Sequence, residues 1–228
     1  MDDRDLIAQL LKGETHLSPQ VVNGILERGP DIAEYLEQLI CNIRLWHTDM
    51  TGQIAVFHSV KLLGALQYSS AVEALSNAIF LAYETANGDV LEELPLAFAR
   101  IGKDGTASLV SILEDKKLNP AVRTVAASGL EGIAVLDEAE TDKILDVFRH
   151  LLAEPEGPVE LHSHVLNLLV HFRRSEDLPL ITSVLSARPI NMDIGESEIA
   201  DYLEESAEPW EWTQYRLDPL EFYEDELA

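Results

Sequence analysis

The sequence predicts an all-α fold built from stacked helix hairpins. Apolar residues recur at three- and four-residue steps through most of the 228 residues, which places them on one face of successive helices. Segments expected to be second helices begin near Ala55, Leu91, Ala121 and Val159, a spacing of roughly 30–40 residues that is typical of helical repeats. An irregular α-bundle with accidental spacing is the alternative architecture.

Start and stop signals delimit the expected helices. Ser18 and Asn119 each precede a proline. We therefore expect each to cap a helix whose first residue is that proline. The run from Ser70 to Glu73 is typical of a capping box, and Gly88 and Gly102 fall where helices should end. The expected helices span residues 3–12, 18–28, 30–44, 52–67, 70–85, 89–101, 105–115, 119–134, 139–153, 158–172, 175–186 and 195–206.

Most links between these helices are short, which favours antiparallel neighbours. Each hairpin then has one apolar face too broad to bury alone, and stacking of neighbours buries these faces in a continuous core. We expect a single helical repeat domain over residues 1–206, with about five to six hairpins, by the repeat lengths of known arrays. Residues 207–228 form a separate acidic and aromatic tail that is docked or partly disordered.

One stretch carries a family resemblance. It comprises Ile112-Leu113-Glu114-Asp115, then Asn119-Pro120-Ala121-Val122-Arg123, then Ala126, Ala127, Leu130 and Ile133 at tight-packing positions. This stretch resembles a HEAT repeat of the phycobilisome-lyase type. The resemblance implies a HEAT-like solenoid, a right-handed α–α superhelix of the armadillo-like kind. It also implies that Asp115 and Arg123 are structural, bonding the turn between repeats and the neighbouring repeat.

The longer stretch from Ser18 to Val135 is similar to a bacterial HEAT-like family of unknown function. Leu17-Ser18-Pro19-Gln20, His58 through Leu66, and Leu91-Glu92-Glu93-Leu94-Pro95 carry this similarity. Members of that group often end in a cysteine-rich zinc motif. This chain has one cysteine, so that motif is not carried over. Both resemblances concern the fold rather than an activity.

The charge is strongly acidic, with 41 Asp and Glu against 16 Lys and Arg and a net charge of −25. Such a surface repels phosphate backbones and anionic lipids, so we expect neither nucleic-acid nor membrane binding. A protein with a basic or neutral surface is the expected partner. The acidic start of the sequence, the lone cysteine and the lack of a long apolar run favour a cytoplasmic location.

Catalytic and metal-binding signals are weak. His162, His164 and His171 lie on one expected helix, and His164 and His171 share a face, which leaves a metal site as an alternative to core or groove-lining histidines. The known ligand spacings, nucleophile elbows and phosphate loops are absent, so we expect no enzyme activity and no cofactor. Cys41 is expected to be a buried small hydrophobe.

The tail is the most unusual region. Residues 191–228 contain thirteen acidic residues and a single arginine, Arg216, together with Trp210 and Trp212. One interpretation is a polar cap whose aromatic side chains dock onto the end of the array. The other is an acidic-aromatic segment that binds a basic partner or folds back over the groove. Docking is favoured, because exposed aromatics form a costly apolar patch.

These observations favour a non-enzymatic protein-binding scaffold or adaptor whose second helices present the binding surface. Candidate partner-binding residues are His58, Arg100, His162, His164, Trp210 and Trp212. Two alternatives remain. One is an enzyme, lyase-like or otherwise, or an enzyme regulator that takes a small molecule in the groove; the other is an acidic mimic of nucleic acid.

Overall fold

The computed structural model describes residues 1–154, 156–195, 197–205 and 212–223, and every regular element in these ranges is helical. The first helices are α1 (Asp3–Leu10), α2 (Pro19–Leu26), α3 (Pro30–Cys41), α4 (Ile43–His47), α5 (Met50–Leu66), α6 (Val72–Glu84) and α7 (Gly88–Ile101). The later helices are α8 (Thr106–Glu114), α9 (Pro120–Leu136), α10 (Glu138–Ala153), α11 (Val159–His171), α12 (Leu178–Ala187), α13 (Ile199–Glu204) and α14 (Thr213–Arg216). The all-α class predicted from the sequence is therefore confirmed for the described residues.

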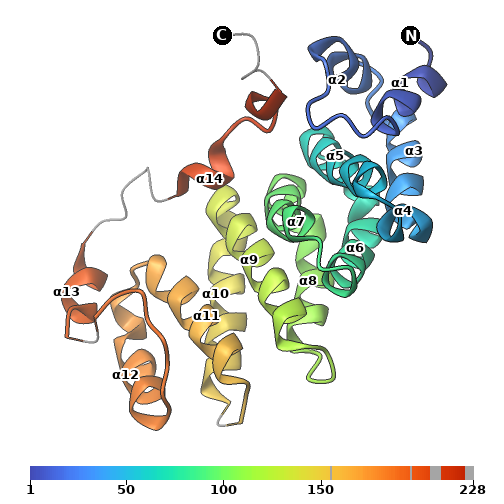
Figure 1. The fold of residues 1–228 in the computed structure, drawn as a ribbon. Helices are drawn as coiled ribbons and strands as arrows, with labels where there is room; N and C mark the ends of the chain where they lie inside the picture. The colour runs from blue at the N-terminus through green and yellow to red at the C-terminus, as the bar shows by residue number, and fades with distance from the viewer. Residues whose placement is uncertain (155, 196, 206–211, 224–228) are drawn as a thin grey trace.

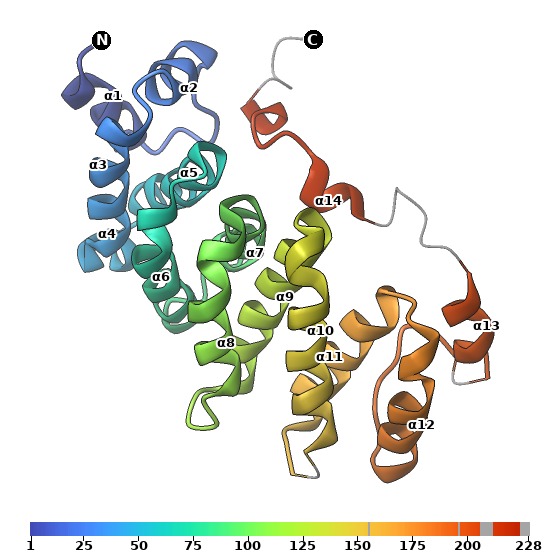
Figure 2. The same cartoon turned by 180° about the vertical axis from the view of Figure 1, so that it is seen from behind.

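The helices form two packed layers (Figures 1 and 2). One layer, which we call the tail-side layer, contains α5, α7, α9 and α11, and each of these helices contacts the next. The opposite layer contains α3, α6, α8 and α10, which pack behind the tail-side layer, and α12 continues it by packing against α10. A continuous apolar core lies between the layers, and its buried members run from Leu6 to Tyr223.

Two tail-side helices meet at very close range because both carry small residues. A Cβ placed on Gly64 of α5 would lie 2.8 Å from the Cα of Ala97 in α7, closer than real Cβ atoms come. Glycine at this position therefore sets the distance between α5 and α7. Phe98 of α7 is fully buried and fills the space towards α8 and α9, beside Gly129.

The predicted boundaries differ from the observed ones at particular side chains. The helix expected over residues 30–44 is divided in two, because Asn42 adopts an extended conformation and its side chain accepts a hydrogen bond from the Arg44 amide at 3.2 Å. The helix expected over residues 195–206 is observed only as Ile199–Glu204. At Ser70 the chain forms the 3₁₀ turn η1 (Ser69–Ala71) instead of the predicted capping box.

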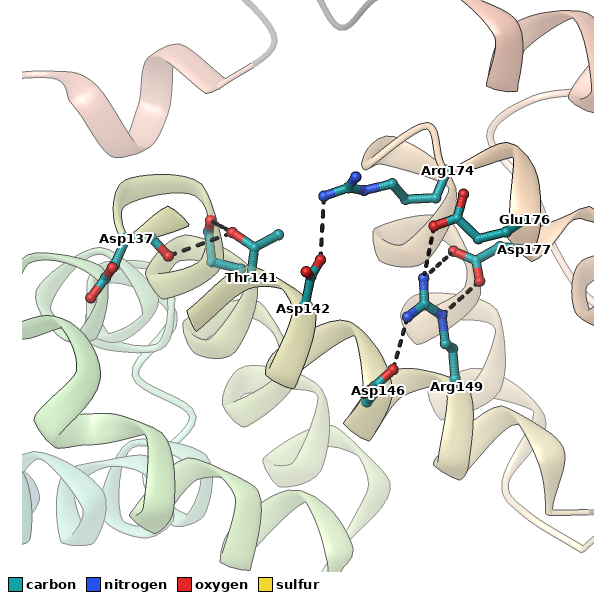
Figure 3. Close-up of polar contacts among 9 residues, drawn as sticks. Asp137, Thr141, Asp142, Asp146, Arg149, Arg174, Glu176 and Asp177 are labelled. Atoms are coloured by element: carbon teal, nitrogen blue, oxygen red, sulfur yellow. Dashed lines mark hydrogen bonds and ion pairs between the residues drawn. The ribbon is translucent and has the colours of Figure 1, made fainter. Parts of the chain in front are cut away.

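An ionic junction joins the last helices of the two-layer stack (Figure 3). Arg149 of α10 donates from Nε and Nη2 to both carboxylate oxygens of Asp177, at 2.7 and 3.1 Å, where the 3₁₀ turn η3 (Ser175–Asp177) leads into α12. Arg149 also donates to Asp146 at 2.8 Å, and Arg174 donates to Asp142 at 3.4 Å. The pKa of Arg149 is raised chiefly by its bond to Asp177, so the guanidinium stays charged.

Candidate functional site

Residues 212–223, which we call the C-terminal strap, cross the tail-side layer from α11 to α5 (Figure 1). The strap begins at Trp212, whose ring centroid lies 5.2 Å from that of Phe172 and 6.2 Å from that of His171. Helix α14 then lies against α7 and α9. The strap ends in the 3₁₀ turn η5 (Glu221–Tyr223), which contacts α5 through Tyr223.

Tyr215 is the central anchor of the strap. Its hydroxyl donates to Oε2 of Glu131 at 2.6 Å, and both residues are only 4% exposed. A Cβ on Gly132 would lie 2.7 Å from the Tyr215 ring, so the glycine leaves the room that this ring needs on α9. Burial, reinforced by the Glu131 carboxylate, raises the pKa of Tyr215 far above its usual value. The hydroxyl therefore remains a hydrogen-bond donor.

Tyr223 is the second anchor, and its acceptor is His58 of α5. Nε2 of His58 lies 2.9 Å from the Glu14 carbonyl oxygen, which can only accept, so this nitrogen carries the proton. Nδ1 then has a free lone pair and accepts from the Tyr223 hydroxyl at 3.0 Å. Burial lowers the pKa of His58, which keeps the imidazole neutral and this arrangement intact.

Phe222 packs between Phe57 of α5 and His16, which lies in the loop between α1 and α2. Its ring stacks on His16 with centroids 5.0 Å apart and meets the edge of Phe57 at 5.5 Å. The ammonium nitrogen of Lys61 lies 4.9 Å from the Phe222 ring centroid, a cation–π distance. The strap thus covers a charged side chain at this end of the layer.

That lysine belongs to a buried ion triad on α5 and α7. Lys61 Nζ donates to Oε2 of Glu93 at 2.5 Å, and Arg100 Nη1 donates to Oε1 of the same carboxylate at 3.1 Å. The three side chains are 5–8% exposed. One carboxylate therefore binds two cations in a place that water hardly reaches, so loss of Glu93 would leave two buried cations without a counter-ion.

A cleft of about 640 Å³ beside the strap has Arg100 and Arg216 as well as Asp137 and Asp218 in its lining. Two further clefts beside the strap are more acidic. One, of about 450 Å³, lies between α5 and α7, and the other, of about 940 Å³, crosses α7, α9 and α11. Glu92 and Leu96 line both clefts, which makes them neighbours on one surface. Their charged lining residues are Asp89, Glu92, Glu93, Lys61, Glu131 and Asp193. Five carboxylates thus face one ammonium group, and that ammonium is already paired with Glu93.

The candidate binding residues fall in different environments. His58 and Arg100 are bonded beneath or beside the strap, as described above. His164 lines the larger cleft and shares a 2.9 Å hydrogen bond with the Ser128 hydroxyl, and burial lowers its pKa. Trp212 belongs to the strap, whereas Trp210 lies outside the described residues.

His162 points away from the tail-side surface although it lies on the same helix as His164. It is 1% exposed, and Nδ1 accepts a hydrogen bond from Arg188, which follows α12. Burial, followed by the Arg188 guanidinium, lowers the pKa of His162 to about 4. The imidazole is therefore neutral near pH 7 and contributes to packing at this position.

Asp115 and Arg123 make separate local contacts. Arg123 is buried and donates from Nε to the Leu113 carbonyl at 2.7 Å, which ties α9 to the last turn of α8. The exposed Asp115 accepts a hydrogen bond from the Lys117 amide at 2.9 Å and so closes the turn between the two helices. These contacts lie within one helix pair.

Several residues at the site were not singled out from the sequence. Glu131 stands between Gly129 and Gly132 in an otherwise apolar run, and a carboxylate at such a position was an available signal. Glu93 follows the exposed Glu92 in the sequence, yet it is only 4% exposed. The aromatic residues of the tail indicate docking, but they do not indicate Glu131 and His58 as the partners of Tyr215 and Tyr223, because these partners lie far away in the sequence.

Metal-binding groups and the single cysteine are the remaining candidates for chemistry in the described ranges. No group of three or more His, Cys, Asp or Glu side chains is placed there to hold a metal ion. Cys41, which was expected to be buried, is exposed at the end of α3, because the break at Asn42 ends the helix there. Partial desolvation, then Glu37 and Glu73, raises the pKa of this thiol, which lowers its reactivity near pH 7.

None of the described helices is long and apolar enough to span a bilayer. In comparisons with known proteins, no family model, no curated protein and no solved structure matches the chain.

Proposed function

We propose that the chain is a HEAT-like solenoid, a right-handed α–α superhelix, and that it is a non-enzymatic scaffold that binds a protein on its tail-side layer. The solenoid is supported by the order of packing, since α5, α7, α9 and α11 follow one another in one layer and α6, α8 and α10 return behind them. Repeat arrays pack each unit against its sequence neighbours in this manner.

One observation carries the binding role: the tail-side layer holds the C-terminal strap across four helices. It does so with acceptors and aromatic seats that the helices supply, namely Glu131, His58 and Phe57. A surface that binds a short helical turn and its flanking chain inside the molecule has the shape and chemistry to bind a similar segment of another protein.

The charge of the two acidic clefts indicates the kind of partner. Five carboxylates line the two clefts, and the exposed Asp89 and Glu92 stand where these clefts meet the solvent. A basic segment would be attracted to this surface over about a Debye length, roughly 10 Å at moderate salt. We therefore propose a partner with a basic binding region.

The test is affinity capture with three full-length chains. The wild type is compared with Asp89→Lys/Glu92→Lys, which reverses charge at the clefts, and with Glu73→Lys/Glu84→Lys, which makes the same change on exposed residues of α6 in the opposite layer. A partner of the tail-side layer should be captured by the wild type and the α6 variant and lost from the cleft variant. It should also be released as salt rises. If no captured protein distinguishes the cleft variant from the α6 variant, the proposal is wrong.

A further inference from the structure

We propose that the tail-side layer recognises a partner segment that presents two tyrosine side chains with the spacing of Tyr215 and Tyr223. On this proposal the C-terminal strap is an internal ligand, and the partner replaces it. The inference rests on the proposed binding role. It adds that the partner carries two tyrosines and that the strap occupies their positions in the free protein.

The two acceptors belong to the helices rather than to the strap. Glu131 is contributed by α9, and its carboxylate accepts from Tyr215 at 2.6 Å with His171 as a more distant partner at 3.5 Å. His58 is contributed by α5, with Nδ1 directed at the Tyr223 hydroxyl. A buried carboxylate that loses its hydroxyl donor is costly, so this surface requires such a donor whenever it is covered.

The rings are recognised as well as the hydroxyl groups. Gly132 leaves space for the ring of Tyr215, and the Tyr215 hydroxyl also lies 3.3 Å from the Ser128 carbonyl oxygen. The ring of Tyr223 lies 5.6 Å from that of His58, centroid to centroid. Each position thus combines an apolar seat for an aromatic ring with an acceptor at its far end, which fits tyrosine better than phenylalanine.

The strap is held by side chains in a way that suits exchange. The amides of Leu217, Glu221 and Tyr223 donate within the strap, to the carbonyls of Thr213, Asp218 and Leu220. Tyr215 and Tyr223 are 4% exposed, whereas the other side chains of the strap are exposed or half-buried. Binding therefore depends on a few anchors, and a competing segment with the same anchors can take their place.

The experiment uses full-length chains and one defined probe, a fluorescent peptide with the sequence of residues 207–228. Its anisotropy is titrated with the wild type, with Tyr215→Ala/Tyr223→Ala, and with Tyr35→Ala/Tyr83→Ala. The last variant is a matched control, because it removes two tyrosines of α3 and α6 that are 40% and 39% exposed. Circular dichroism establishes that each chain is folded.

The peptide should bind the Tyr215→Ala/Tyr223→Ala chain at least about tenfold more tightly than the wild type. In the wild type a tethered strap competes at an effective concentration on the order of millimolar. The control variant should behave like the wild type. A second peptide with both tyrosines replaced by alanine should bind the strap variant at least about tenfold more weakly than the native peptide.

Equal binding to all three chains, or no binding to any folded chain, would overturn the proposal. If the alanine variant does not fold, Tyr215→Phe/Tyr223→Phe replaces it, since it keeps the rings and removes only the hydroxyl groups. The native peptide should then gain affinity by a smaller factor of about three to ten, and an unchanged affinity would count against the proposal. A captured partner that needs Asp89 and Glu92 but leaves the strap in place would refute this inference and retain the scaffold function.

Discussion

The contact between α7 and α9 and the junction between α10 and α12 hold neighbouring helices by opposite means. Between α7 and α9 the contact is apolar and very close, with Phe98 fully buried and a Cβ on Gly132 reaching within 2.7 Å of the Ala99 Cβ. Between α10 and α12 it is ionic, with Arg149 bonded to the 4%-exposed side chain of Asp177. The first should resist salt and acid, whereas the second should respond to both.

The largest effect should come from the apolar contact. Phe98→Ala removes a fully buried ring that lies against Gly105, the residue before α8, so it loses the transfer free energy and leaves a cavity. We expect the free energy of unfolding to fall by about 3–5 kcal/mol, measured by urea titration, with little dependence on salt. Leu136→Ala, which truncates a side chain that is 40% exposed, is the control and should cost less than about 1 kcal/mol. A loss from Phe98→Ala as small as the control would show that the contact is loosely packed.

The ionic junction should give the next largest effect. Arg149→Met keeps much of the side-chain volume but leaves Asp177 buried without its guanidinium. We expect a loss of about 2–3 kcal/mol, below the range for fully buried pairs because Arg149 is 27% exposed. The matched control is Arg174→Met, whose ion pair with Asp142 is exposed and should contribute less than about 1 kcal/mol. The Arg149 effect should shrink at high salt in the same urea titrations, and a salt-independent loss would contradict an ionic origin.

Acid should act on the tail-side helices α5 and α11 through histidines that are held neutral. The pKa values of His58, His162 and His164 are lowered on folding, chiefly by burial, so the unfolded chain binds more protons below its own histidine pKa of about 6.5. The stability they contribute is present above that pH and is lost as pH falls, down to about 4 for His162. We expect a loss on the order of 1 kcal/mol between about pH 7.5 and 5, from urea titrations. His162→Gln should flatten that slope, and an unchanged slope would assign the loss to other groups.

The sequence predicts the helices well and the strap poorly, and the reason is the range of the interactions. Apolar spacing and the Asn119-Pro120 start predict α9 to within two residues of its observed end, Leu136, because these signals are local. Asn42 was a recognisable capping residue, but a run of helix-forming residues on both sides concealed the break. The start of α13 lies later than the predicted residue 195, at Ile199, where Glu198 is the N-cap residue.

The residues of the candidate site also fall into two groups, those that a local sequence pattern indicates and those that it does not. The pattern of the second helices indicates His58 and His164, and both lie on the tail-side surface. His162 and His164 are two positions apart on α11, so their side chains leave the helix about 200° apart. Apolar residues flank both histidines, so only the packing of α11 decides that His162 is the one that faces Arg188. The pairing of Tyr215 with Glu131 spans 84 residues, and no local pattern predicts a contact over that distance.

The smallest effect should come from an exposed ion pair. Lys116 and Glu154 approach to 2.7 Å between two helix ends, and their side chains are 66% and 31% exposed. The pair lowers the pKa of the Glu154 carboxyl, yet water and salt screen it. Lys116→Ala should therefore change the free energy of unfolding by less than about 0.5 kcal/mol in urea titrations at moderate salt. A loss comparable to that of Arg149→Met would mean that exposed pairs also hold the C-terminal helices, and burial would no longer separate the two kinds of ionic contact.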